Sequence, residues 1–417
     1  MTITTRPDRL AGNRAFRLLF GAAAISKFGT STGYLAIPLT AVAVLGASPG
    51  QVGLLGALGT AAFLLVGLPA GAWVDRLPKR AVMVTADLAR AALLLSLPVA
   101  WWLGALTFAQ LCVVTFAAGL ATVFFDVATM SFVPHVVGQR SLMSANSTLV
   151  GMDAVNDIGG RSLGGYAIQL FGGPAAILVD AVSYLASAVL LRSLRTTEPP
   201  ARGDRPGLRR EIAAGLRFVL GDGVLRAFVI AGVLTNTAIV MINTMLPVVF
   251  VRELGLSATA LGLYLAVGGA GTLIGSICAR RVAARLGYGR TLWLAGLCIA
   301  PVGFAVPFVD RGPLLYLAAA SWFVTTVKVG VDNVIKVSIR QSATPPDLLG
   351  RMNATFRFLL TGALSIGAAL AGVLGDLTGP RTALWVGAAG LALVWLPISL
   401  SPVRNLRDLP TSSPPRC

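Results

Sequence analysis

The sequence predicts an all-α polytopic membrane protein, with twelve transmembrane helices in two pseudo-symmetric halves of six. Of its 417 residues, 55% are hydrophobic, 12% are charged and 47 are glycines. Apolar runs of about 20 residues, enough for a helix to cross roughly 30 Å of hydrocarbon, recur along the whole chain. These runs do not alternate as the strands of a membrane barrel do, so we expect helices to satisfy the backbone hydrogen bonds in lipid.

One polar connection divides the apolar runs into two sets. Residues 194–215, LRTTEPPARGDRPGLRREIAAG, form the only long, proline-containing connection in the chain. The expected regions are a first half at 1–194, a cytoplasmic linker with an amphipathic segment at 195–215, a second half at 216–402 and a cytoplasmic tail at 403–417. The expected spans lie at residues 16–43, 51–73, 81–103, 107–133, 146–170, 174–194, 224–250, 257–282, 288–309, 313–338, 351–374 and 380–401.

The net charge of +17 follows the expected membrane topology. Arginines gather before the first span, in alternate connections, in the 194–215 segment and at the end of the chain, whereas connections such as GASPGQ and WWLGALT carry no cation. The positive-inside rule therefore predicts a multi-pass membrane protein with both termini and the central linker in the cytoplasm. The basic character indicates topology and contact with the lipid bilayer, and we expect no nucleic-acid partner.

The two halves carry related segments. A shift of about 205 residues aligns FFDVATMSF, around Asp126, with GVDNVIKVSI, around Asp332. The same shift aligns GGYAIQLFGGPAA with GVLGDLTGPRTA. Duplication of this kind is typical of carriers, whose substrate site lies near the membrane midplane between the repeats.

Four segments carry a resemblance to a known family: NRAFRLLF, GAWVDRLPKR, SFVPHVVGQRSLMSANS and PPDLLGRMNATFRF. With them the chain resembles the major facilitator superfamily, and within it the bacterial exporter branch that includes enterobactin and macrolide efflux proteins. The resemblance covers essentially the whole chain. It implies a monomeric transporter of the bacterial cytoplasmic (inner) membrane, with a central cavity lined by spans 1, 4, 7 and 10.

The segment GAWVDRLPKR resembles the superfamily's loop 2–3 signature, G-x-x-x-D-R-x-G-R-R, with Pro78 in place of a glycine. The resemblance implies that Asp75 lies at the N-terminus of span eleven, where a helix dipole favours an anion. The loop would then close the cytoplasmic side when the cavity faces outward. Five residues would form this cytoplasmic gate: Gly71, Asp75, Arg76, Lys79 and Arg80. For the cations, simple topology remains an alternative.

Charged residues inside the spans are functional candidates, because each costs about 2.5–3.5 kcal/mol on insertion scales. We hypothesise that Asp126 and Asp332, paired with Lys27 and Lys328, form the proton-coupling and substrate-charge network. Lys328, Asp332 and Lys336 step by four, so ion pairs are possible along one helix face. The other cavity candidates are Asn236, Asn243, Asn333 and Lys336. The alternative is a set of static salt bridges that hold the spans together.

Span five carries a second constellation, GMDAVNDIGGRSLGGYAI. Its IGGRSLGG resembles the exporter signature G-P-x-x-G-G, with an arginine where the signature has proline. The glycines are expected to pack against GGAGTLIGS of span eight. We favour neutralisation of the arginine within its own helix over a direct role in substrate binding. The residues concerned are Asp153, Asp157, Gly160, Arg161, Gly164 and Gly165.

Other polar groups and motifs suggest little chemistry. We interpret Asp87 and Arg90 as a helix-end pair near the gate, and Asp180 as interfacial. The chain has no P-loop, no G-x-S-x-G and no H-E-x-x-H, and its single histidine and four cysteines lack metal-ligand spacing. We therefore predict no enzyme activity, no cofactor and no metal.

The sequence favours a secondary active transporter, specifically a proton-coupled exporter (an antiporter) of a small amphipathic drug, secondary metabolite or siderophore, working by alternating access. Its partners would be this substrate, protons and the bilayer. Three alternatives stay open: a lysophospholipid flippase, an importer, or a non-transporting sensor or scaffold. Sodium also remains an alternative to the proton as the coupling ion.

Overall fold

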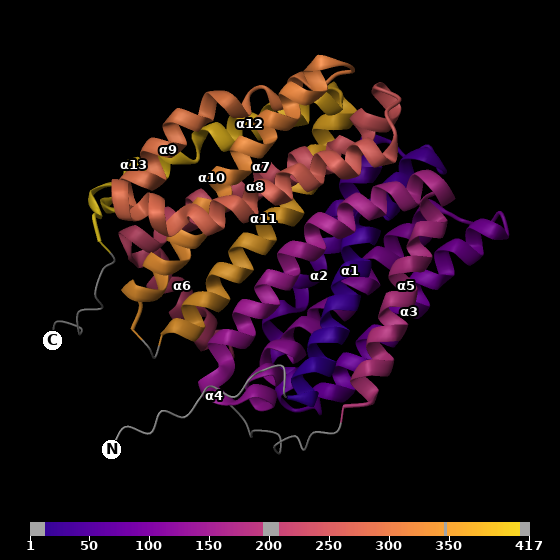
Figure 1. Cartoon of the computed structure of the whole chain (residues 1–417), viewed down its shortest axis with the longest axis horizontal. Coiled ribbons are helices and arrows are strands. Elements are labelled where there is room, and N and C mark those ends of the chain that lie inside the picture. The colour runs from indigo at the N-terminus through magenta and orange to yellow at the C-terminus, as the bar shows by residue number, and fades with distance from the viewer. Residues whose placement is uncertain (1–12, 195–207, 346–347, 409–417) are drawn as a thin grey trace.

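A computed structural model describes residues 13–194, 208–345 and 348–408, and every regular element within them is a helix (Figure 1). The α-helices of the N-terminal part (residues 13–194) are α1 Arg14–Ala43, α2 Pro49–Asp75, α3 Lys79–Trp102, α4 Phe108–Phe171 and α5 Gly173–Arg192. Those of the C-terminal part (residues 208–408) are α6 Leu208–Gly221, α7 Gly223–Pro247, α8 Ala258–Leu286, α9 Tyr288–Gly303, α10 Pro313–Ala343, α11 Leu349–Thr378, α12 Pro380–Leu393 and α13 Trp395–Ser399. Three short helical elements, η2 Val248–Glu253, η3 Val306–Phe308 and η4 Pro402–Asn405, complete the set.

The protein is a multi-pass helical membrane protein. In the part of the chain that the structure describes, ten helical segments are long and apolar enough to cross a membrane. Two further helical stretches, α1 and the part of α4 after Gly138, lie against them within the N-terminal part.

The connection expected between spans four and five is a sharp bend rather than a loop. Helical residues continue on both sides of Gly138, whose φ of 70° and ψ of 165° break the helix there. A positive φ is readily adopted only by glycine, so this residue permits α4 to turn back without an intervening loop.

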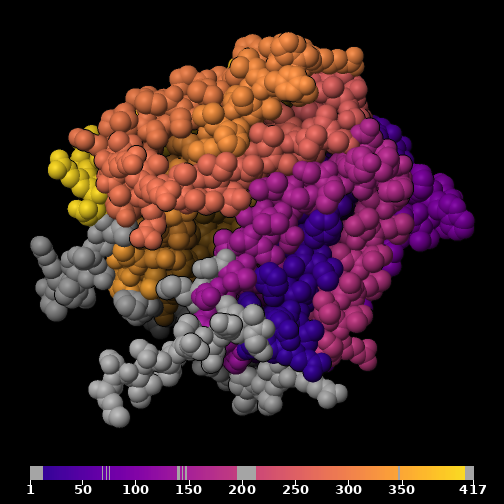
Figure 2. All heavy atoms as spheres, viewed as in Figure 1, coloured from indigo at the N-terminus to yellow at the C-terminus, as the bar shows by residue number. Residues whose placement is uncertain are grey.

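Two seams join the N-terminal and C-terminal parts: α2 packs against α11, and α4 packs against α8. Each seam contains a glycine pair at close approach. A Cβ added at Gly53 would lie 2.4 Å from the Cα of Gly372, and one added at Gly165 would lie 3.0 Å from the Cα of Gly262. Figure 2 shows the second seam on the near face, where α4 meets α8. Small residues thus let these backbones touch.

The hydrophobic core is shared on one side of the molecule and divided on the other. We call the side that carries α6 and the starts of α7 and α11 the α6 side (Figure 1). On the opposite side, a single cluster draws side chains from both parts, such as Leu35, Val52, Phe250 and Trp322. On the α6 side, the two parts keep separate clusters, one around Phe132 and Leu191 and the other around Phe228 and Phe356.

Polar contacts reinforce the opposite side. The carboxylate of Asp376, at the end of α11, accepts hydrogen bonds from Gly50 N (2.8 Å) and Ser48 Oγ (3.2 Å) at the start of α2. Arg252 Nη2 donates to the backbone carbonyl of Ala47 at 2.7 Å. Both contacts connect the N-terminal part to the C-terminal part, so this side of the molecule is closed.

Candidate functional site

A cavity of about 420 Å³ lies between the two parts, lined by α1 to α5 together with α7 and α11. Its volume falls in the range of small-molecule sites, which is roughly 300–1,000 Å³. The lining is mainly apolar, with the aromatic rings of Tyr34, Phe63 and Tyr184. Its two charged lining residues are both acidic, Asp126 and Asp180. The cavity therefore suits an apolar ligand that carries polar or positive groups.

Asp126, a predicted coupling residue, is paired with a residue that the sequence did not single out. Its Oδ2 lies 3.6 Å from Nη2 of Arg357 on α11. The expected partner Lys27 interacts electrostatically with Asp126 and Asp153 but makes no ion pair with either. The sequence places Arg357 within PPDLLGRMNATFRF, but periodicity alone cannot show that it reaches a helix of the other part.

The three-residue stripe on α10 has the ion pairs that its spacing allows. Lys328 Nζ lies 2.6 Å and Lys336 Nζ lies 3.2 Å from Asp332 Oδ2, and all three side chains are largely buried. Lys328 and Asp332 line a separate cavity of about 20 Å³ between α7, α9, α10 and α12, enough for roughly one water molecule. Asp332 thus does not face Asp126 across the larger cavity.

The three asparagines take different positions. Asn243 lines the central cavity, and its buried Oδ1 accepts no hydrogen bond from the described residues. Asn236 Nδ2 donates to the carbonyl of Leu360 at 2.9 Å, which links α7 to α11. Asn333 is exposed and lines neither cavity. Asn243 is therefore the asparagine that a ligand in the central cavity would contact.

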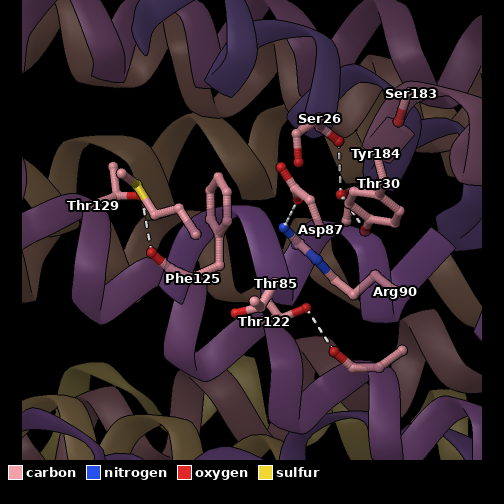
Figure 3. A network of polar contacts seen from close by, with 12 residues as sticks. Ser26, Thr30, Thr85, Asp87, Arg90, Thr122, Phe125, Thr129, Ser183 and Tyr184 are labelled. Atoms are coloured by element: carbon pink, nitrogen blue, oxygen red, sulfur yellow. Dashed lines mark hydrogen bonds and ion pairs between the residues drawn. The ribbon is translucent and has the colours of Figure 1, made fainter. Parts of the chain in front are cut away.

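Asp87 and Arg90 lie in the interior, which corrects the expectation of a helix-end pair (Figure 3). The side chains form an ion pair, and the two residues are only 0% and 2% exposed. The guanidinium lies between two rings, 4.5 Å from the centre of Phe125 and 4.1 Å from that of Tyr184. Tyr184 Oη in turn lies 2.9 Å from Thr30 Oγ1. This network fixes α1, α3, α4 and α5 beside the cavity wall.

Asp180 is also buried, contrary to its expected interfacial position. It is 6% exposed, lines the central cavity, and packs its carboxylate against Gly29 and Gly33 of α1. Its Oδ1 has no hydrogen-bond donor among the described residues. Burying a carboxylate without a full set of donors is costly. Asp87 and Asp180 together place two carboxylates in the region of one guanidinium, that of Arg90. The sequence could not predict that these three groups lie together.

Span five lies in the second part of α4, and its glycines contact partners other than those expected. Gly160 and Gly164 pack against α1, and Gly165 packs against α8 at Ala258 and Gly262. Three glycines of GGAGTLIGS, Gly268, Gly271 and Gly275, instead pack against α10, and Gly269 lies against Ile158 of α4. The prediction of packing against span eight therefore holds for one of the three span-five glycines, Gly165, whose contacts on α8 lie before the expected segment.

The acidic and basic residues of span five remain close together. Arg161 Nη2 lies 3.5 Å from Asp157 Oδ2, and Ser31 Oγ donates to Asp157 Oδ1 at 3.1 Å. The guanidinium also lies 5.0 Å from the ring centre of Tyr34, which lines the cavity. Asp153, one turn earlier, is exposed. These contacts are those of a self-neutralised pair that ties α4 to α1.

The segment expected to form the cytoplasmic gate lies on the α6 side, where the cores are separate. A side chain at Gly71 would meet nothing within 4 Å, so the Gly71 face of α2 is open here, whereas Ala70 and Val74 beside it are buried against other helices. Arg80 donates from Nε and Nη2 to backbone carbonyls at the end of α5, the first at 3.1 Å. Arg76 is exposed and Lys79 is half-buried. The side chain of Asp75 lies outside the described residues.

Metal binding finds no support among the side chains that the structure describes, where no three His, Cys, Asp or Glu residues are grouped to hold an ion. The three cysteines that it describes, Cys112, Cys278 and Cys298, are free thiols.

Comparison with known proteins identifies relatives over most of the chain. The chain is 28% identical over 369 residues to the multidrug efflux pump Tap of Mycolicibacterium fortuitum, covering 86% of this chain and 88% of Tap. It is 25% identical over 293 residues to the enterobactin exporter EntS of Salmonella choleraesuis, covering 69% and 68%. These relatives confirm the resemblance to the exporter branch.

Solved structures share the fold at low sequence identity. A bacterial homologue of the iron transporter ferroportin in an inward-facing state superposes with a TM-score of 0.74 at 18% identity, covering 93% of this chain and 98% of that one. The nucleoside transporter NupG superposes with a TM-score of 0.75 at 12% identity, covering 92% and 99%. These likenesses show the fold alone.

The family model of the Major Facilitator Superfamily matches residues 19–333, which is more than half of the chain. The family and the relatives are transporters and not enzymes. The chain therefore belongs to the major facilitator superfamily.

Proposed function

We propose that this protein is a proton-coupled exporter of small amphipathic molecules in the bacterial inner membrane, acting as a monomer by alternating access. The observation that carries the proposal is the cavity of about 420 Å³ with an apolar wall and two acidic residues, enclosed on one side by contacts between the two parts. The similarity of the chain to a multidrug efflux pump and to an enterobactin exporter supports the outward direction.

The proposed architecture is twelve spans in two halves of six, at 1–194 and 216–402. The bend at Gly138 supports counting α4 as two spans, which with α1 brings the ten segments to twelve. The two glycine pairs support the duplication, because Gly53 corresponds to Gly262 and Gly165 to Gly372 at close to the same shift of about 205 residues.

The proposed state is inward-facing. Described arginines concentrate on the α6 side, for example Arg285, Arg340 and Arg404, and the positive-inside rule places that side in the cytoplasm. The separate cores lie on that side and the joined core on the other. The cytoplasmic gate at 71–80 would then close in the outward-facing state, in which Gly71 would come into contact with another helix.

Asp126 is the proposed coupling residue, because it lines the cavity and its ion pair joins the two parts. A proton on this carboxylate would remove the attraction to Arg357. The Lys328–Asp332–Lys336 cluster is the second candidate, since its buried carboxylate lies between two cations that would respond to its protonation. The span-five pair of Asp157 and Arg161 is proposed as structural.

The test is accumulation of dyes and drugs in bacteria that lack their own efflux pumps. Wild-type protein should lower accumulation, an uncoupler should abolish the effect, and Asp126→Asn should behave like the uncoupler. Asp310→Asn is the matched control, because that exposed carboxylate bonds only the adjacent backbone amide among the described residues. Export that survives both the uncoupler and Asp126→Asn would refute proton coupling at this site.

Two further measurements separate the alternatives. In proteoliposomes, transport driven by an imposed sodium gradient and not by a pH gradient would replace the proton with sodium. Movement of lysophospholipid between leaflets in the absence of a pH gradient would favour the flippase. Absence of any substrate flux from well-folded protein would favour a sensor or scaffold.

A further inference from the structure

The guanidinium of Arg357 occupies a site built by the opposite part of the protein. Arg357 belongs to α11, yet three of its contacts are to α2 and α4. Nη2 lies 3.6 Å from Asp126 Oδ2, Cζ lies 4.5 Å from the ring centre of Phe63, and Nη1 lies 2.9 Å from Met130 Sδ.

These three groups share an affinity for organic cations. A carboxylate attracts positive charge, an aromatic face attracts it through the ring quadrupole, and a thioether is polarizable and adapts to irregular apolar shapes. Asp126 and Phe63 also line the central cavity, and none of the described lining residues is basic. A cation in the cavity would therefore reach two of the three groups that Arg357 contacts, and Met130 lies one helical turn from Asp126 on α4.

The contact with Arg357 is weak enough to be exchanged. Its 3.6 Å separation is longer than the 2.7–2.9 Å of a good charge-assisted hydrogen bond. The side chains of Arg357 and Asp126 are 36% and 48% exposed, so water screens their attraction. Lys27 and Arg90 also interact electrostatically with Asp126, but neither lines the cavity.

We propose that Asp126, Phe63 and Met130 form a binding site for organic cations with an apolar body, and that Arg357 is an internal occupant which such a ligand displaces. Because Arg357 comes from the other part, its displacement breaks one link between α11 and the N-terminal part. Ligand binding is thereby connected to the relative position of the two parts. The inference builds on the proposed function by naming its substrate class.

The test is equilibrium binding of radiolabelled tetraphenylphosphonium to the purified full chain in detergent. Arg357→Ala should bind this cation about two- to five-fold more tightly than wild type, the range expected for loss of an exposed competing ion pair. Arg357→Gln should act in the same direction while retaining a side chain of similar shape. Asp126→Asn should lose at least about ten-fold in affinity, and Phe63→Leu should lose several-fold.

Two controls make the measurement specific. Arg381→Ala removes an arginine that pairs with Glu253 at 2.9 Å. Neither residue lines the cavity, so this variant should leave binding unchanged. The neutral triphenylphosphine oxide has a similar apolar body and should not respond to Asp126→Asn.

Unchanged or weaker binding in folded Arg357→Gln would overturn the internal-occupant proposal, and unaltered binding in Asp126→Asn would overturn the cation site. Binding is measured without any ion gradient, so loss of proton-driven export alone leaves this inference standing. Export of only neutral or anionic compounds would contradict the cation site while leaving the exporter intact.

Discussion

The seam between α2 and α11 allows a quantitative test of how the two parts separate. In Gly53→Ala the added Cβ would lie 2.4 Å from the Cα of Gly372 and 2.8 Å from the carbonyl oxygen of Ala368. Ordinary carbon contacts are about 3.5–4.0 Å, so the helices must move apart by roughly 1 Å. Both obstructing atoms are backbone atoms, which no rotamer change can relieve.

The cost of such overpacking is about 1–3 kcal/mol. If α2 and α11 separate at this seam when the protein changes conformation, the penalty falls only on the conformation in which the seam is closed. The ratio of open to closed molecules should then rise roughly 5- to 150-fold. The control is Gly59→Ala on the same helix, whose Cβ would meet only Thr115 Cγ2 at an ordinary 3.5 Å.

Double electron–electron resonance can measure the change. Spin labels at Leu103 and Leu377, both exposed on the side opposite α6, would report the separation of the two parts after serine replaces the four native cysteines. Gly53→Ala should shift the distance distribution to longer values, and Gly59→Ala should not. An unchanged distribution in well-folded Gly53→Ala would refute the idea that this seam holds the closed state.

Three other changes give separate tests. Asp376→Asn should weaken the cap on α2 by no more than about 1 kcal/mol, because the carboxylate is exposed, and should lengthen the same spin-label distance. An unchanged distance would show that this cap does not hold the two parts together. Arg90→Met should destabilise the protein by about 3–5 kcal/mol, since it leaves Asp87 as an unpaired buried charge, and Asp87→Asn should restore part of the melting temperature. Gly33→Ala should lower the melting temperature, because its Cβ would lie 2.4 Å from Asp180 Oδ2, and adding Asp180→Ala should reverse the loss. Failure of the second substitution to raise the melting temperature would contradict this steric explanation.

Features that depend on local sequence could be predicted. The apolar runs predicted helices, and a spacing of four residues predicted that Lys328 and Lys336 can both reach Asp332 on α10. The family resemblance was carried by short segments and was confirmed.

Contacts that depend on which helices are neighbours could not be predicted from the sequence. The Asp126–Arg357 pair joins residues far apart in the chain, and no periodicity predicts it. Asp180 was placed at an interface because it stands near the end of a span, yet the glycines of α1 create the space that buries it. Helical spans could be expected from apolar length, but the bend within α4 depends on the backbone angle of Gly138.

The core shared by both parts has a thermal consequence. Opening the side opposite α6 would expose apolar side chains of that cluster to water, and closing it would bury them again. Exposure of apolar surface raises the heat capacity, so the two conformations should differ in heat capacity as well as in shape. If this step limits turnover, the logarithm of the transport rate should curve against reciprocal temperature instead of following a straight Arrhenius line.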